Sequence, residues 1–132
     1  METLLLVLAV TGIASQYAPG VMDEVITNRQ KWEQIPQDVS NFDGYIAVQN
    51  SGDIGKVFYI KPEGYDSWEK FLAVDCAGIA DGGKSWMLRN NILVEVDYST
   101  AERWDAVGRG KKIRMLTEEQ YTNSYRYRGL DK

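Results

Sequence analysis

The stretch 71–104, FLAVDCAGIADGGKSWMLRNNILVEVDYSTAERW, contains two apolar runs that each end in an aspartate. The first run, FLAVD, closes at Asp75, and the second, ILVEVD, closes at Asp97. Short apolar runs bounded by glycine, asparagine and aspartate are typical of β-strands. We therefore expect strands over 70–76 and 92–97, and the central question is what the two carboxylates do.

The flanking sequence contains further runs of the same kind. They are predicted as strands at 12–17, 45–49, 55–60 and 111–116. One helix is expected over 21–32, where apolar residues recur at helical spacing. Six short strands, few helices and long loops favour a closed barrel over an open sheet. The predicted fold class is thus mainly β, a six-stranded barrel with one or two short helices.

A second, short helix is expected after Asp97. Ser99 and Glu102 have the S-x-x-E spacing of a capping box, and Gly108 is a suitable terminator for this helix. Asp97 itself has two interpretations, a helix-capping residue or a functional carboxylate. The glycine-containing segment 77–91, which precedes the fifth strand, is predicted to hold little regular structure.

Composition limits the possible chemistry. The chain has 132 residues, 44% of them hydrophobic and 26% charged, which is the size and balance of a single domain. Its net charge of −4 provides no basic field for nucleic acid, so no nucleic-acid partner is expected. Cys76 is the only cysteine and there is no histidine, which excludes an internal disulfide and Ser-His-Asp machinery. Chemistry would have to use carboxylates, tyrosines or lysines, and we expect no metal and no cofactor.

The two ends of the chain lie outside the predicted barrel. Residues 1–11 contain an apolar run that is too short to span a bilayer, and Glu2 stands where a signal peptide usually carries a positive charge. A strand extension is therefore favoured over a cleaved signal. Residues 117–132 are predicted to be a polar tail, either disordered or docked elsewhere. Its tyrosines and arginines form either a segment for a neighbouring chain or a solvated end: Tyr121, Tyr125, Arg126, Tyr127 and Arg128.

The order of these segments resembles the rare lipoprotein A family. GIASQYAPG (12–20) is similar to the opening strand of that family, AVQNSGDIG (47–55) to its second strand and turn, AVDCAG (73–78) to its fourth strand, and EVDYSTAERWDAVGRGKKIRM (95–115) to its closing unit. The resemblance covers roughly 12–116. It implies a double-psi β-barrel, the fold shared with expansins, barwin-like proteins and family 45 endoglucanases.

The resemblance also implies roles for individual residues. In that family the aspartate ending the fourth strand is catalytic in non-hydrolytic cleavage of peptidoglycan, and Asp75 matches it. Asp97 matches an aspartate that expansins also keep near their groove. The family's catalytic histidine falls at Gln49, whose amide binds ligands but does not transfer protons at neutral pH. Cys76 stands where the family usually has arginine or lysine, and it is either a small buried thiol or a nucleophile.

Five other side chains, some of them polar and some aromatic, are candidates for ligand binding. They are Gln49, Asn50, Tyr65, Trp68 and Trp86. The two amides either contact a sugar or belong to an ordinary turn. The aromatic side chains either stack on sugar rings or cover the end of the barrel.

Three classes of function follow from these observations. The first is a glycan-binding or cell-wall-associated module on a degenerate barrel that lacks the catalytic histidine. The second is a peptidoglycan-cleaving lytic enzyme that uses Asp75 and Asp97 as acid and base. The third is a structural subunit of an assembly, such as a phage virion or filament. Its contacts with other chains, or with copies of itself in a homo-oligomer, would use residues 1–11 and 117–132. The resemblance favours an extracellular, cell-envelope or virion location, and no membrane span is expected.

Overall fold

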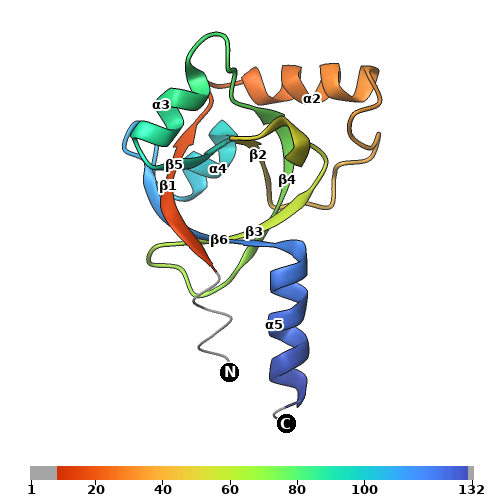
Figure 1. Cartoon of the computed structure of the whole chain (residues 1–132), viewed down its shortest axis with the longest axis vertical. Helices are drawn as coiled ribbons and strands as arrows, with labels where there is room; N and C mark the ends of the chain where they lie inside the picture. Colours follow the sequence, from red (N-terminus) through yellow and green to blue (C-terminus); the bar gives the residue numbers. More distant parts are fainter. Residues whose placement is uncertain (1–8, 131–132) are drawn as a thin grey trace.

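The computed structural model describes the backbone of residues 9–130 and the side chains of residues 9–124 (Figure 1). The strands are β1 (Val10–Gln16), β2 (Gly44–Val48), β3 (Val57–Pro62), β4 (Glu69–Cys76), β5 (Ile92–Val96) and β6 (Lys111–Thr117). The helices are α2 (Val21–Lys31), α3 (Gly83–Arg89), α4 (Tyr98–Arg103) and α5 (Glu118–Leu130), with one 3-10 turn, η1 (Ser51–Asp53). Each described strand begins and ends within two residues of the bounds that the sequence predicts.

The strands close into a barrel in the order β1-β5-β2-β4-β3-β6. The β1/β5 and β2/β4 pairs are parallel, and the remaining pairs are antiparallel. Exchanging β1, β2 and β3 with β4, β5 and β6 reproduces the same set of neighbours, so the barrel consists of two equivalent, crossed halves. The predicted mainly β, six-stranded barrel is confirmed, and this order agrees with the double-psi topology.

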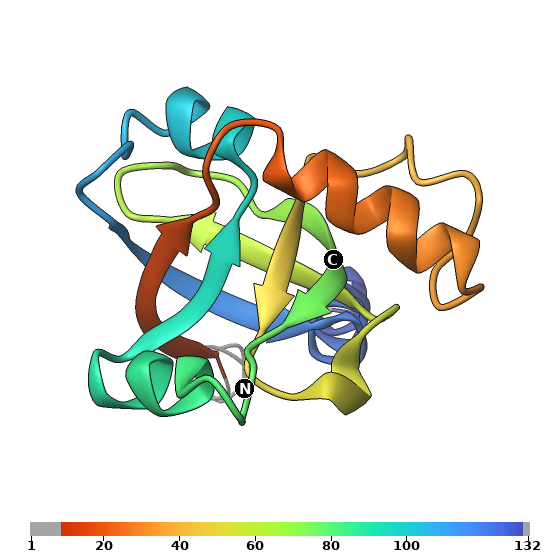
Figure 2. The ribbon, with the colours of Figure 1, turned by 90° about the horizontal axis from the view of Figure 1, so that it is seen from above.

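Apolar side chains fill the barrel and also cover part of its outside. Inside, Phe71 and Val96 belong to one cluster, which also contains Trp104 from the end of α4 at 1% exposure. Outside, Met22 of α2 packs on Leu72 and Val74 of β4 in a second cluster. Figure 2 shows the ring of strands with α2 lying against its β2/β4 side. The long connection between β1 and β2 is therefore fixed on the barrel surface.

Two predictions about the helices are wrong. The described residues contain four α-helices rather than one or two, because segment 77–91 includes α3 and the polar tail includes α5. α5 begins at a capping box within this tail: the Thr117 amide donates to Oε1 of Gln120, and the Gln120 amide donates to Oγ1 of Thr117. α5 extends away from the barrel (Figure 1). The ring of Tyr121 in its first turn is stacked 3.6 Å from that of Tyr59. Residues 1–8 of the strand extension predicted at 1–11 lie outside the described residues, and so do the side chains of Tyr125 to Arg128.

The bounds of α4 also differ from the predicted ones. Asp97, not Ser99, is its N-cap, and the helix ends before Gly108 because Asp105 adopts a left-handed conformation at φ 54°. The amides of Asp105 and Ala106 then donate to carbonyl groups of the last turn. Across the described part of the chain, no helix combines the length and the apolar character needed to cross a bilayer.

Candidate functional site

Four strands bring Ser15, Ala47, Asp75 and Glu95 into one row across the outside of the barrel. Ser15 pairs with Glu95, Glu95 with Ala47, and Ala47 with Asp75. Their neighbours along β2 and β5 belong to the interior cluster, and successive side chains of a strand point to opposite faces. Two carboxylates therefore flank one small methyl group on the outer surface.

Both oxygens of Asp75 are hydrogen-bonded to side chains from other parts of the fold. The Tyr17 hydroxyl donates to Oδ2 at 2.6 Å, and Nη2 of Arg29 donates to Oδ1 at 2.7 Å. Nη1 of Arg29 in turn donates to Oε1 of Gln34 at 2.8 Å. The Asp75 and Arg29 side chains are 19% and 23% exposed, so solvent screens this ion pair less than one at the open surface. The end of β1, the helix α2 and the end of β4 thus meet at Asp75.

Tyr17 and Glu95 both titrate abnormally because of this arrangement. Tyr17 follows β1, and its hydroxyl reaches across the intervening strands β5 and β2 to Asp75 on β4. Burial, followed by the hydrogen bond to Asp75, raises the pKa of Tyr17. Burial, followed by the negative charge of Asp75, raises the pKa of Glu95. Glu95 therefore keeps a proton to higher pH than an ordinary glutamic acid.

The end of α2 determines how Arg29 and Gln34 meet. Glu33 adopts a left-handed conformation at φ 57°, its amide donates to the Gln30 carbonyl, and the Gln34 amide donates to the Arg29 carbonyl. These bonds form a Schellman motif, which folds the chain back over the last helical turn. Trp32 occupies the C-cap position of that turn and its side chain is 72% exposed. The motif thus presents a large aromatic ring beside a polar side-chain network.

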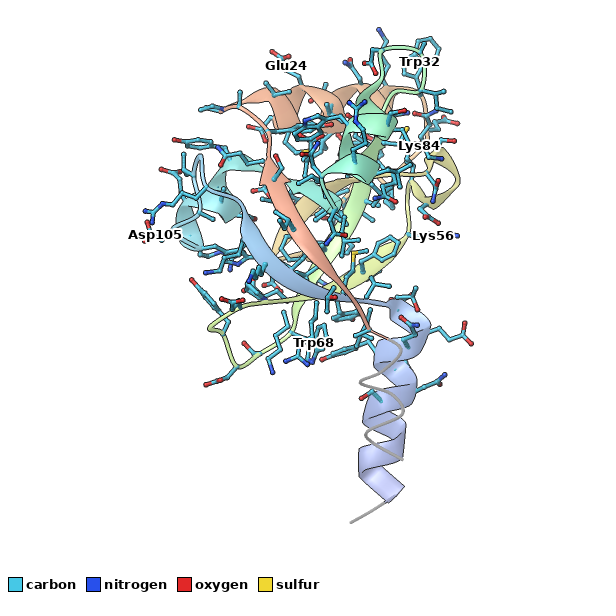
Figure 3. All side chains as sticks on the ribbon, turned by 60° about the vertical axis from the view of Figure 1, so that its left-hand side comes forward. Glu24, Trp32, Lys56, Trp68, Lys84 and Asp105 are labelled. Atoms are coloured by element: carbon cyan, nitrogen blue, oxygen red, sulfur yellow. The ribbon has the colours of Figure 1, made fainter. Side chains whose placement is uncertain are left out.

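A shallow hollow of about 200 Å³ lies at this junction, and we name it the Trp32 hollow. Its lining consists of Val25, Asn28, Arg29, Trp32, Gln34 and Asp75. Figure 3 labels Trp32 at the upper end of the barrel, remote from Trp68 at the lower end. Pockets that enclose a drug-sized ligand measure roughly 300–1,000 Å³. The Trp32 hollow therefore suits a single ring, or one unit of a longer ligand that runs past it.

Asp97 lies in a different environment. Its Oδ1 accepts hydrogen bonds from the Tyr45 amide at 2.9 Å and the Thr100 hydroxyl at 2.7 Å, and its Oδ2 accepts one from the Thr100 amide at 3.1 Å. It lines a separate hollow that includes Met22 near the start of α2, whereas Asp75 contacts Arg29 near the end of that helix. Roughly 10 Å of helix separates these two positions. The capping interpretation of Asp97 is confirmed, and the carboxylate adjacent to Asp75 is Glu95.

The other candidate residues from the sequence fall into two groups. Nε2 of Gln49 donates to the Ile92 carbonyl at 2.8 Å, and Nζ of Lys84 on α3 donates to Oδ1 of Asn50. Trp86, 42% exposed, lies on the same helix, α3. Gln49, Asn50 and Trp86 are therefore all associated with α3 or the strand after it.

The second group, Tyr65 and Trp68, belongs to the connection between β3 and β4. Tyr65 is half-buried against the interior cluster, and its hydroxyl donates to the Arg103 carbonyl at 3.1 Å. Trp68 is also half-buried. Cys76 is half-buried and packs against the same cluster. These contacts give Tyr65 and Cys76 a place in the scaffold, and the predicted ligand contacts of all five residues stay predictions.

The sequence contained a signal for only one of the site residues that we did not predict. Glu95 interrupts the apolar run ILVEVD with a charge, whereas Trp32 lies seven residues after Val25, on the apolar side of the predicted helix, so its position does not indicate exposure. Arg29 and Tyr17 carry no local signal, because their partner Asp75 is 46 and 58 residues away in the chain. Only the closed barrel brings them together.

Comparison of the chain with family models, curated proteins and solved structures gives no match of any of these kinds. The resemblance to the rare lipoprotein A family therefore stays a prediction from the sequence. Within residues 9–124, no three acidic or cysteine side chains converge as metal ligands would. The site is described by its own geometry: an exposed tryptophan, a carboxylate held by arginine and tyrosine, and a glutamic acid with a raised pKa.

Proposed function

We propose that the protein is a glycan-binding module and that the Trp32 hollow is its binding surface. The exposed indole of Trp32 is the observation that carries this proposal. A tryptophan exposed to this degree loses the free energy of burial, and its flat apolar face suits the C–H face of a sugar ring. Arg29, Gln34 and Asn28 line the same hollow and offer planar hydrogen-bonding groups to sugar hydroxyls.

Binding accounts for the site better than cleavage does. A general acid or base needs to reach the reacting atom with a free proton or lone pair. Both oxygens of Asp75 already accept strong hydrogen bonds, Asp97 caps α4, and the amide of Gln49 is bonded to a main-chain carbonyl. The arrangement supports a fixed polar surface that orients a ligand.

Sedimentation with purified peptidoglycan sacculi tests the proposal, using Trp32→Ala and Trp86→Ala as a matched pair. Both are exposed tryptophans, but only Trp32 lines the hollow, and Trp86 belongs to α3. We expect Trp32→Ala to weaken binding about tenfold, since aromatic stacking contributes roughly 0.5–1.5 kcal/mol beyond area burial. Trp86→Ala should bind like the wild type.

Three results would redirect the proposal. A larger loss for Trp86→Ala would move the binding surface to α3, as the sequence alone predicted. Release of soluble muropeptides during the incubation would favour the lytic enzyme. No retention of the wild-type protein, combined with elution as a stable multimer, would favour the assembly subunit, which the projecting helix α5 supports (Figure 1).

A further inference from the structure

A second row of side chains crosses the outside of the barrel on β3, β6 and β1. Lys61 pairs with Arg114, and Arg114 pairs with Thr11. Ile60 and Pro62, which flank Lys61 along β3, are buried, so the Lys61 side chain points outward. Lys112 is also exposed, two residues before Arg114 on the same strand. Three cations therefore gather on one face of a protein whose net charge is −4.

This placement is unfavourable for the isolated protein. Like charges directly opposite each other on neighbouring strands destabilise a sheet. Within the described residues, Lys61, Lys112 and Arg114 form no ion pair, although acidic side chains outnumber basic ones in the chain. Glu63 and Asp66 in the neighbouring loop offset part of this repulsion without forming an ion pair with the three cations, and a bound anion would offset the rest.

The same face is hollowed, and we name this depression the Lys61 hollow. It has a volume of about 500 Å³, within the range that encloses a small molecule. Its lining includes Thr11, Lys61, Glu63, Asp66, Lys112 and Arg114. Glu63 and Asp66 come from the loop after β3, so the hollow contains acidic as well as basic side chains.

We propose that the Lys61 hollow binds the phosphate group of a hydroxylated phosphate monoester, such as a sugar phosphate. An arginine guanidinium donates two parallel hydrogen bonds to a phosphate, and lysine adds a mobile positive charge. Glu63 and Asp66 repel a second anionic group but accept hydrogen bonds from hydroxyls. The remainder of the ligand is therefore neutral and rich in hydroxyl groups.

This site is independent of the Trp32 hollow. The β3 and β6 strands lie at the end of the barrel from which α5 projects, whereas α2 lies at the other end (Figure 1). The two hollows share no lining residue. A failure of glycan binding at Trp32 would therefore say nothing about the phosphate site. The two sites are tested in separate experiments.

Titration of the ¹⁵N-labelled full-length protein tests the phosphate site, with inorganic phosphate, glucose 6-phosphate and glucose as probes at low salt. We expect amide shifts at Lys61 and Lys112 to Arg114 with both phosphates, tighter binding of glucose 6-phosphate, and no shifts with glucose. Lys61→Gln/Arg114→Gln should weaken binding of glucose 6-phosphate about tenfold or more, because charge-assisted hydrogen bonds are lost. Lys112→Gln should give a smaller loss in the same direction.

The control removes one lysine and one arginine elsewhere, as Lys84→Gln/Arg89→Gln on α3. This variant has the same net charge as the test variant and should bind glucose 6-phosphate like the wild type. An equal loss in the two double variants would show a general effect of surface charge and would overturn the proposal. Absence of shifts at Lys61 and Arg114 would do the same, and equal affinity for phosphate and glucose 6-phosphate would overturn the assignment of a monoester.

Discussion

Asp75 and Asp97 each end an apolar strand, yet the two carboxylates have different surroundings. Asp97 accepts its three hydrogen bonds from Tyr45 and Thr100, in a corner where even a Cβ atom on Gly44 would come within 2.8 Å of Oδ1. Asp75 accepts its bonds from Tyr17 and Arg29, at the edge of a hollow that is open to solvent. One aspartate is part of the scaffold, and the other is part of a surface.

The chain that follows each aspartate explains this difference. A helix starts directly after Asp97, and the free N–H groups of its first turn require an acceptor. After β4 ends at Cys76 the chain runs as a loop to Gly82, so no adjacent helix needs the oxygens of Asp75. They are bonded instead by side chains that are distant in sequence. A strand-ending carboxylate is thus a better functional candidate when no helix follows it.

The largest effect should come from Asp97→Ala. This change removes the N-cap of α4, leaves the Tyr45 amide without its acceptor, and should cost about 2–3 kcal/mol of unfolding free energy. Ser99→Ala is the control, because Ser99 is exposed and is not the cap, and it should cost close to nothing. Urea melts of the two variants measure both values. Equal losses would mean that Ser99 takes part in capping after all.

A smaller loss of stability is expected for Asp75→Ala. Arg29 is 23% exposed and can turn to water once its partner is gone, so the cost should be about 1 kcal/mol. The loss of free energy of glycan binding should exceed the loss of unfolding free energy, because Arg29 and Tyr17 lose their fixed positions. The control is Asp53→Ala, which breaks an exposed pair with Lys56 and should change neither quantity. A cost near that of Asp97→Ala would place Asp75 in the scaffold as well.

The sequence predicts the barrel well because strand signals are local. Each described strand combines an apolar run with a turn-forming boundary, and both are visible within about ten residues. The short helices α3 and α5 were harder to predict. Gly82 and Gly83 open α3 and discourage a helical prediction, while Thr117 and Gln120 have the same capping spacing as Ser99 and Glu102 but precede no apolar stripe.

The candidate site was only partly predictable, for a different reason. Asp75 is recognisable as a carboxylate after an apolar run, but its partners depend on strand order and on where α2 packs. Tyr17 meets Asp75 because β1 and β4 flank the β5/β2 pair in the closed barrel. No local pattern encodes that contact. Residues such as Trp32 become candidates only when their exposure is known.

The smallest expected effect concerns Glu95, which shares the outer row with Asp75 and tests whether the two carboxylates are coupled. Burial and the charge of Asp75 raise the pKa of Glu95, so the folded protein holds this proton more tightly than the unfolded chain does. The stabilising contribution of protonated Glu95 is fully present below its unfolded pKa. It is lost as the pH rises through the folded pKa.

Glu95→Gln should therefore unfold at higher denaturant concentration than the wild type at pH 7.5, and this advantage should shrink as the pH falls to about 4, where a glutamic acid in an unfolded chain becomes protonated. Glu24→Gln, an exposed glutamate on α2, should show no such trend. Adding Asp75→Asn removes the neighbouring negative charge, which is the second cause of the raised pKa, so it should reduce the advantage of Glu95→Gln at pH 7.5. An advantage that is independent of pH, or unchanged by Asp75→Asn, would show that Glu95 and Asp75 do not interact, and the outer row would then be two separate carboxylates.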